Sequence, residues 1–259
     1  MEFWTQSKGN IFVAAHRGWR SRYPENTLLA FRKALELGVD QIETDVRVTA
    51  DGELVLIHDD SVDRTTNGTG RVEEMTYAQL QELDAGQGEK IPTLRQLLEL
   101  VQAHPTVTLD IELKEYPTEG REALSYEVCH RVLEMLEAYG FRERTVINTW
   151  NGMLQGHIHE TYGDKWKQHL YYPRRLMGEY TEDPFTYGYC TCVFGILDGQ
   201  LPLEEVQQLE KDTGVRIWAG AYAKDESSVL ESVRYGAELI TCDNPDEVLE
   251  ILRKHKLHK

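Results

Sequence analysis

Two carboxylates alternate with less polar residues in the segment IETDVRV at 42–48, and no other feature constrains the fold as strongly. Side chains of a β-strand point alternately to its two faces, so Glu43 and Asp45 project together from one face. Like charges this close raise each other's pKa or repel unless a cation neutralises them. The segment therefore predicts a strand that carries a site for a hard divalent cation with oxygen ligands.

Histidines end two further apolar runs. After a turn that contains glycine, the run 54–57 ends at His58, close in sequence to the acidic pair. The run IFVAA at 11–15 ends at His16, and a short continuous apolar run is typical of a buried parallel strand. Because imidazole titrates near neutral pH, both residues are candidates for general acid and base catalysis.

Strand patterns alternate with helix patterns along the chain. Strands are predicted near 11–15, 41–48, 106–113, 145–148, 169–172, 192–197, 215–219 and 239–242, and helices near 28–37, 94–104, 123–139, 153–162, 203–211, 227–235 and 245–253. About eight βα units and a length of 259 residues suit a (β/α)8 barrel. We therefore predict a single TIM-barrel domain over 1–259, with a polar insertion at about 59–91 after the second strand.

Polar side chains gather at the predicted strand ends. In a barrel of this kind the carboxyl ends of the strands form the face that carries the active site. Glu112 adds a third carboxylate, so Glu43, Asp45 and Glu112 supply oxygen ligands for one Mg²⁺ or Ca²⁺, with Mn²⁺ as a further candidate. Arg17 and Lys114 supply positive charge for a phosphate. Their alternative role is to neutralise the acids.

Composition argues against several classes of partner. The formal net charge of -16, from 44 acidic and 28 basic residues, disfavours nucleic acids and anionic membrane surfaces, which require a basic protein face. Since no run resembles a signal peptide or a membrane helix, we expect a cytoplasmic protein without stable membrane association. The four cysteines form no CxxC pair and are expected to be reduced structural thiols. Nothing in the pattern indicates an oligomeric state.

A cation, two basic side chains and two imidazoles suit the cleavage of a phosphodiester. The cation and Arg17 would stabilise charge on the phosphoryl oxygens. Of His16 and His58, one would take a proton from the nucleophile and the other would give one to the leaving alkoxide. Two mechanisms remain open, because either water or a hydroxyl of the substrate could attack phosphorus, the latter through a cyclic phosphate.

Several segments together resemble the glycerophosphodiester phosphodiesterase family, whose members are (β/α)8 barrels. The matching segments are AHRG at 15–18, PENT at 24–27, IETDVRVTADGELVLIHDD at 42–60, DRTTNGTG at 63–70, KIPTL at 90–94, DIELK at 110–114 and GAELITCDNP at 236–245. The resemblance implies hydrolysis of small glycerophosphodiesters, such as glycerophosphocholine or glycerophosphoethanolamine, to glycerol 3-phosphate and an alcohol. It also implies that the insertion at 59–91 is the family's insertion after the catalytic histidine.

The resemblance implies a role for every candidate residue. It implies that His16 and His58 are the acid/base pair and that Arg17 and Lys114 contact the phosphate. It further implies that the metal ligands are Glu43, Asp45 and Glu112. The segment IWAGAYAKD at 217–225 departs from the family pattern, so it stays open whether Trp218 or Tyr222 faces the ligand.

Two other functions are compatible with parts of this pattern. A phospholipase D-like enzyme that acts on lysolipids or sphingolipids has a similar layout of histidines and acids, but the net charge of -16 disfavours it. A non-catalytic module that binds a phosphodiester or Ca²⁺ is the other alternative. Pure binding does not require two groups able to transfer protons, so the enzyme is the leading hypothesis.

Overall fold

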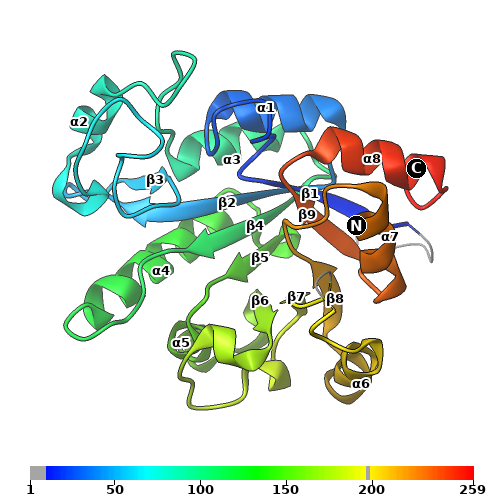
Figure 1. Ribbon diagram of the computed structural model, residues 1–259. Helices are drawn as coiled ribbons and strands as arrows, with labels where there is room; N and C mark the ends of the chain where they lie inside the picture. The colour runs from blue at the N-terminus through cyan, green and yellow to red at the C-terminus, as the bar shows by residue number, and fades with distance from the viewer. Residues whose placement is uncertain (1–9, 197–198) are drawn as a thin grey trace.

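The computed structural model describes residues 10–196 and 199–259, and its parallel strands form a closed barrel with helices outside (Figure 1). The barrel strands are β1 (Phe12–His16), β2 (Gln41–Val48), β4 (Thr108–Leu113), β5 (Thr145–Asn148), β6 (Lys167–Tyr172), β7 (Cys190–Val193), β8 (Arg216–Ala219) and β9 (Leu239–Cys242). Since β1 pairs in parallel with both β2 and β9, the sheet closes on itself. The predicted (β/α)8 architecture is confirmed.

Helices cover the outside of the barrel and follow its strands in the chain (Figure 1). They are α1 (Leu28–Leu37), α3 (Leu94–Gln102), α4 (Glu122–Ala138), α5 (Gly152–Tyr162), α6 (Leu203–Thr213), α7 (Glu226–Arg234) and α8 (Pro245–Lys254). The connection after β6 differs, because its described residues form only the short 3-10 turns η4 (Arg174–Met177) and η5 (Pro184–Thr186). The strand predicted near 192–197 begins earlier, as β7, and its last predicted residue lies outside the described residues.

The residue that caps the start of α1 determines which side chains of the loop after β1 remain available to the site. The sequence allows either Asn26 or Thr27 to cap this helix, and the structure selects Thr27, whose Oγ1 accepts a hydrogen bond from the backbone N of Ala30 at 3.2 Å. Gly38 ends the helix with φ 87°, a left-handed conformation that glycine adopts without strain. Asn26 is left free of the capping role and can serve the polar site.

The predicted insertion after the second strand is confirmed. Its first element, β3 (Leu54–Leu56), pairs antiparallel with β2 and is followed by η1 (Val72–Glu74) and α2 (Tyr77–Glu82) at the edge of the barrel (Figure 1). A small apolar cluster holds it together, formed by Val55, Ile57, Val62, Val72, Leu80, Ala85 and Ile91. Because the chain turns back along β2, the backbone N of Ile57 donates to the carbonyl of Asp45 at 3.2 Å. His58 is thereby returned to the level of the acidic pair.

The main apolar core lies between the strands and the surrounding helices. Outward residues of β2 and β4, such as Ile42 and Ile111, pack in it with Phe31 and Leu97 of the helices. All four cysteines are buried and free, as expected for structural thiols. No helix in the described ranges is long and apolar enough to cross a membrane. The inward residues near the strand ends are polar instead, and they build the site.

Candidate active site

The three predicted metal ligands meet at the carboxyl ends of β2 and β4. Parallel pairing sets Asp45 beside Glu112, and Glu43 one step deeper on the same face of β2. Glu43, Asp45 and Glu112 are buried, and one carboxylate oxygen from each lies within 4.8 Å of the other two. Such a group of three buried carboxylates could hold a metal ion.

The acidic group carries more negative charge than its neighbours offset. Burial raises the pKa of Glu43 well above its ordinary value, and the carboxylates of Asp45 and Asp110 raise it further. Burial also disfavours the charge of Asp45, but Lys114 and Arg17 outweigh it and lower the pKa of Asp45 to about 2. An all-oxygen donor set with surplus negative charge fits a hard divalent cation.

The two basic side chains both contact the acids. Lys114 Nζ lies 3.1 Å from Asp45 Oδ1 and also contacts Glu112. Arg17 Nε lies 3.3 Å from Asp45 Oδ2, and its Nη1 donates to Glu25 Oε1 at 2.9 Å. Neutralisation of the acids, the alternative role, is therefore observed. Both side chains also border the cavity at the centre of the site, described below, where an anion would meet them.

The loop after β1 wraps around Asp45. Arg17 and Asn26 adopt left-handed backbone conformations, with φ of 58° and 55°. Asn26 Nδ2 donates to Asp45 Oδ2 at 2.8 Å, and Asn26 Oδ1 accepts from Thr44 Oγ1 at 2.7 Å. The unusual backbone thus places an amide that fixes the orientation of a candidate ligand.

Each predicted catalytic histidine is held by a carboxylate. His16 Nδ1 lies 2.7 Å from Asp243 Oδ1, and His58 Nδ1 lies 2.6 Å from Asp59 Oδ1. Arg64 bridges Asp59 to Glu25 and so stiffens this side of the site. With Nδ1 engaged, Nε2 of each imidazole is the atom available for proton transfer.

One cavity of about 240 Å³ collects these groups. Both histidines, Arg17 and Lys114 border it, and an aromatic wall faces them that consists of Trp150, Tyr171, Phe194 and Tyr222. Of the two aromatic residues in the divergent segment 217–225, Tyr222 borders this cavity, whereas Trp218 is buried and absent from its lining.

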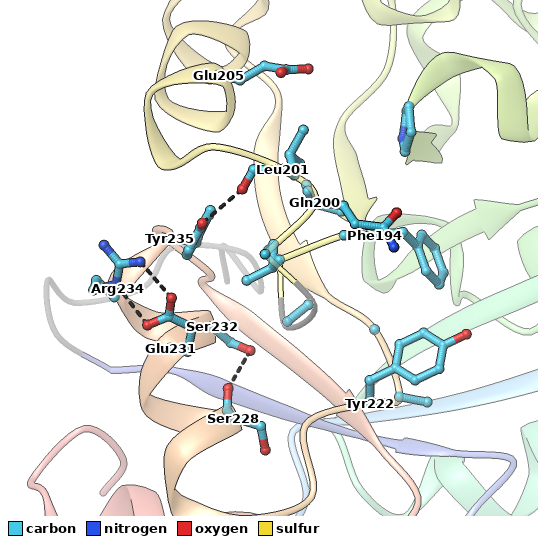
Figure 2. Close-up of a pocket in the computed structure, with 18 of the residues that line it drawn as sticks. Phe194, Gln200, Leu201, Glu205, Tyr222, Ser228, Glu231, Ser232, Arg234 and Tyr235 are labelled. Carbon is cyan, nitrogen blue, oxygen red and sulfur yellow. Dashed lines mark hydrogen bonds and ion pairs between the residues drawn. The ribbon is translucent and has the colours of Figure 1, made fainter.

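A larger cavity of about 1270 Å³ adjoins the first over the ends of β7 and β8. Phe194 and Tyr222 border both cavities, and Figure 2 shows them across from residues of α7, which form the opposite wall of the larger one. Tyr235 supports this wall, since its hydroxyl donates to the carbonyl of Leu201 at 2.8 Å. A ligand in the smaller cavity therefore has room to extend past the aromatic pair.

Sequence reasoning missed partners that are distant in the chain. It did not connect His16 with Asp243, nor Asp110 with His169, whose Nδ1 lies 2.7 Å from Asp110 Oδ2 in the cavity wall. A signal for the second pair existed. Asp110 lies two residues before Glu112 on one strand, and His169 lies two residues before Tyr171 on another. Residues two apart share a face of a strand, so Asp110 points into the barrel if Glu112 does, and His169 does so if Tyr171 does.

Comparisons with known proteins place the chain in a family. The model of the glycerophosphoryl diester phosphodiesterase family matches residues 16–181. A glycerophosphodiester phosphodiesterase of Caldanaerobacter subterraneus subsp. tengcongensis is 32% identical over 261 residues, which cover 93% of this chain and 98% of the relative.

Solved structures share the fold. A protein from Silicibacter pomeroyi DSS-3 superposes with a TM-score of 0.83 at 25% identity, over 97% of this chain and 96% of the other. A phosphodiesterase from Oleispira antarctica, solved in complex with the product sn-glycerol-3-phosphate, superposes with a TM-score of 0.78 at 23% identity, over 93% and 96% of the two chains.

Proposed function

Since the chain belongs to the glycerophosphoryl diester phosphodiesterase family and is a phosphoric diester hydrolase, we propose that it hydrolyses glycerophosphodiesters to glycerol 3-phosphate and an alcohol. One observation carries the proposal. Glu43 and Glu112, which form the buried triad with Asp45, border one small cavity. Two carboxylate-held histidines, His16 and His58, border the same cavity. A binding module would not need those two groups for proton transfer.

The acidic triad fits one divalent cation, with Mg²⁺, Ca²⁺ and Mn²⁺ as candidates. Its oxygen donors match the preference of hard cations. Burial and the neighbouring acids raise the pKa of Glu43, which means that its negative charge is disfavoured unless a cation offsets it. When bound, the cation would supply concentrated positive charge for the phosphoryl oxygens.

Arg17 and Lys114 are assigned to the phosphate group. Both border the cavity, and both are already held in place by their contacts with Asp45. The guanidinium offers paired N–H donors that match two phosphate oxygens, whereas the ammonium acts as a point charge. Preorganised donors of this kind stabilise charge that develops during the reaction.

His16 and His58 are assigned to proton transfer. One Nε2 takes a proton from the attacking oxygen, and the other gives a proton to the oxygen of the leaving alcohol. Asp243 and Asp59 hold Nδ1 of the two rings, so each imidazole keeps its orientation as its charge changes. The histidine that accepts the proton can take it from water or from a hydroxyl of the substrate, so this assignment holds for either nucleophile.

The proposal extends to the remaining expectations from the sequence. Residues 1–259 act as one catalytic domain in the cytoplasm, and the partner is a small diester. The phospholipase D-like alternative differs in requiring a dispersed lipid as substrate. We have no observation that favours it over the small diester.

Release of glycerol 3-phosphate from glycerophosphocholine and glycerophosphoethanolamine tests the proposal. The same assay with lysophosphatidylcholine in detergent tests the lipid alternative. We expect turnover of the small diesters in the presence of a divalent cation. Turnover confined to the lipid, or none at all from folded protein, would contradict the proposed function.

A further inference from the structure

A third histidine borders the central cavity and has no part in the proposed proton transfers. His169 lies on β6, at the same level of the barrel as Asn148, which in turn is paired with Glu112. Only 4% of its surface is exposed. Its Nδ1 lies 2.7 Å from Asp110 Oδ2, and Asp110 is fully buried.

The second nitrogen of this ring, Nε2, is buried and, within the described part of the chain, unpaired in a residue that borders the cavity. A carboxylate can only accept a hydrogen bond, so a neutral His169 beside it carries its proton on Nδ1 and presents a lone pair on Nε2. Nε2 has no hydrogen-bond partner among the described residues, although His169 and Asp110 both border the cavity. Since buried polar atoms are nearly always paired, this acceptor suits a ligand that donates a hydrogen bond.

Aromatic rings fix the direction of the imidazole. Tyr171 stacks on it with ring centroids 5.3 Å apart, and Trp218 meets it edge-on at 5.0 Å. Trp150 stacks on the other side of Tyr171 at 3.8 Å, so the cavity wall beside His169 is flat and apolar. An acceptor beside an aromatic wall fits a group with both carbon-bound hydrogens and hydroxyls.

The position beside His169 Nε2 is unfavourable for a phosphate group. Its oxygens carry negative charge, which the lone pair of His169 and the carboxylate of Asp110 both repel. Positive charge lies instead with Arg17 and Lys114, which follow β1 and β4. The phosphate therefore lies nearer those residues, and another part of the diester lies against His169.

We propose that His169 Nε2 accepts a hydrogen bond from a hydroxyl of the substrate's glycerol moiety, and that Asp110 is a positioning residue that holds the ring in this tautomer. The inference rests on the proposed function and deepens it. The glycerol moiety is the part that all glycerophosphodiesters share, whereas the varying alcohol can extend past Phe194 and Tyr222 into the larger cavity.

The first experiment compares two ligands that differ only in their hydroxyls. Binding of glycerol 3-phosphate and of propyl phosphate is measured by calorimetry, with a saturating divalent cation, for the parent protein and for His169→Asn. Asparagine retains a donor near the position of Nδ1 for Asp110 and removes Nε2. We expect the parent protein to prefer glycerol 3-phosphate by about 10-fold, the value of one good hydrogen bond, and the variant to lose this preference.

The matched control is His104→Asn, in the turn before β4 at the opposite end of the barrel, where the preference should stay unchanged. An equal loss of affinity for both ligands, or an unchanged preference in His169→Asn, would overturn the inference. Failure of the proposed function is distinguishable, because the parent protein would then release no glycerol 3-phosphate from any diester.

A second measurement does not depend on the folding of His169→Asn. Nitrogen-15 NMR of the parent protein reports which ring nitrogen of His169 carries the proton. We expect Nδ1, and in Asp110→Asn we expect a shift toward the Nε2-protonated form together with a loss of the preference for glycerol 3-phosphate. A proton on Nε2 in the ligand-free parent protein would overturn the inference, since that atom could not then accept a hydrogen bond.

Discussion

Lys114 and Asp45 form a buried ion pair, with Lys114 Nζ 3.1 Å from Asp45 Oδ1. Burial opposes the charge of each, yet Lys114 together with Arg17 lowers the pKa of Asp45 to about 2. Glu112 and Asp45 in turn raise the pKa of Lys114. A candidate phosphate contact is thus the counter-ion of a candidate metal ligand. Removing Lys114 leaves buried Asp45 with Arg17 as its remaining counter-ion, and removing Asp45 leaves Lys114 with Glu112.

Replacement of this lysine should destabilise the protein and make it depend on cations. In EDTA, Lys114→Met should lower the free energy of unfolding by about 3–5 kcal/mol, as expected when one partner of a buried pair is removed. Saturating Mg²⁺ or Ca²⁺ should restore more stability to the variant than it adds to the parent protein, because the cation replaces the lost positive charge. Urea titrations with and without EDTA measure both effects.

The control is Lys33→Met, since Lys33 pairs only with Glu36 on the exposed face of α1 among the contacts found here. Its effect on the free energy of unfolding should be much smaller than that of Lys114→Met, because solvent screens an exposed ion pair. A Lys114→Met protein that is as stable as the parent in EDTA would show that the ion pair does not contribute to the free energy of unfolding.

Loss of either proposed proton-transfer group should reduce turnover strongly. We expect His16→Ala and His58→Ala each to lower kcat by at least ~10²-fold, because a positioned acid or base contributes that much. Circular dichroism and Tm should remain close to those of the parent protein. His104→Ala, at the other end of the barrel, is the matched control. Near-normal kcat in a folded variant would remove that histidine from the acid/base pair.

Glu43→Gln should mainly weaken the dependence on the cation. The amide keeps the shape of the side chain but removes its charge, so the cation concentration at half-maximal activity should rise by about 10-fold or more. Glu36→Gln, on the exposed face of α1, should leave the titration curve unchanged. The ligand role of Glu43 is wrong if its variant and the control titrate alike.

Glu25 should contribute to stability in a manner that depends on pH. Although burial disfavours its charge, hydrogen bonds from Arg64 and the charge of Arg17 lower the pKa of Glu25 from 4.5 to about 2. Since the folded-state pKa lies below the unfolded value, its contribution is complete above pH 4.5 and is lost as the pH falls toward about 2.

We therefore expect Glu25→Gln to lower the free energy of unfolding by about 1–3 kcal/mol at pH 7. The difference from the parent protein should shrink when urea unfolding is repeated at pH 4 and pH 3. Glu36→Gln again serves as the control. A difference that is constant over this range would mean that the carboxylate is not held by Arg64 and Arg17.

Periodicity along the chain was sufficient to predict the barrel. Apolar runs such as 11–15 mark buried strands, and the alternation of Glu43 and Asp45 sets their side chains on the inner face. Once the fold is a parallel barrel, all strand ends share one face, and the candidate residues must converge. The gathering of six of the seven predicted residues follows from that rule, whereas His58 reaches the site because β3 runs back along β2.

Partners across the barrel could not be predicted in the same way. The contact of His16 with Asp243 joins the first and last strands, and its existence depends on barrel closure and register. The choice of Thr27 over Asn26 as the helix cap depends on the left-handed backbone at Asn26, a conformation that asparagine can adopt but that no local pattern requires. The lack of a described α-helix between β6 and β7, by contrast, agrees with the sequence, which predicts no helix between these strands.

The most direct test of a metal-dependent glycerophosphodiesterase is release of glycerol 3-phosphate from glycerophosphocholine after treatment with EDTA and after separate addition of Mg²⁺, Ca²⁺ and Mn²⁺. We predict that EDTA abolishes turnover and that at least one ion restores it, but not in Glu43→Gln at the same concentration. Turnover that persists in EDTA, or folded protein that stays inactive with every ion, would contradict the role assigned to Glu43, Asp45 and Glu112.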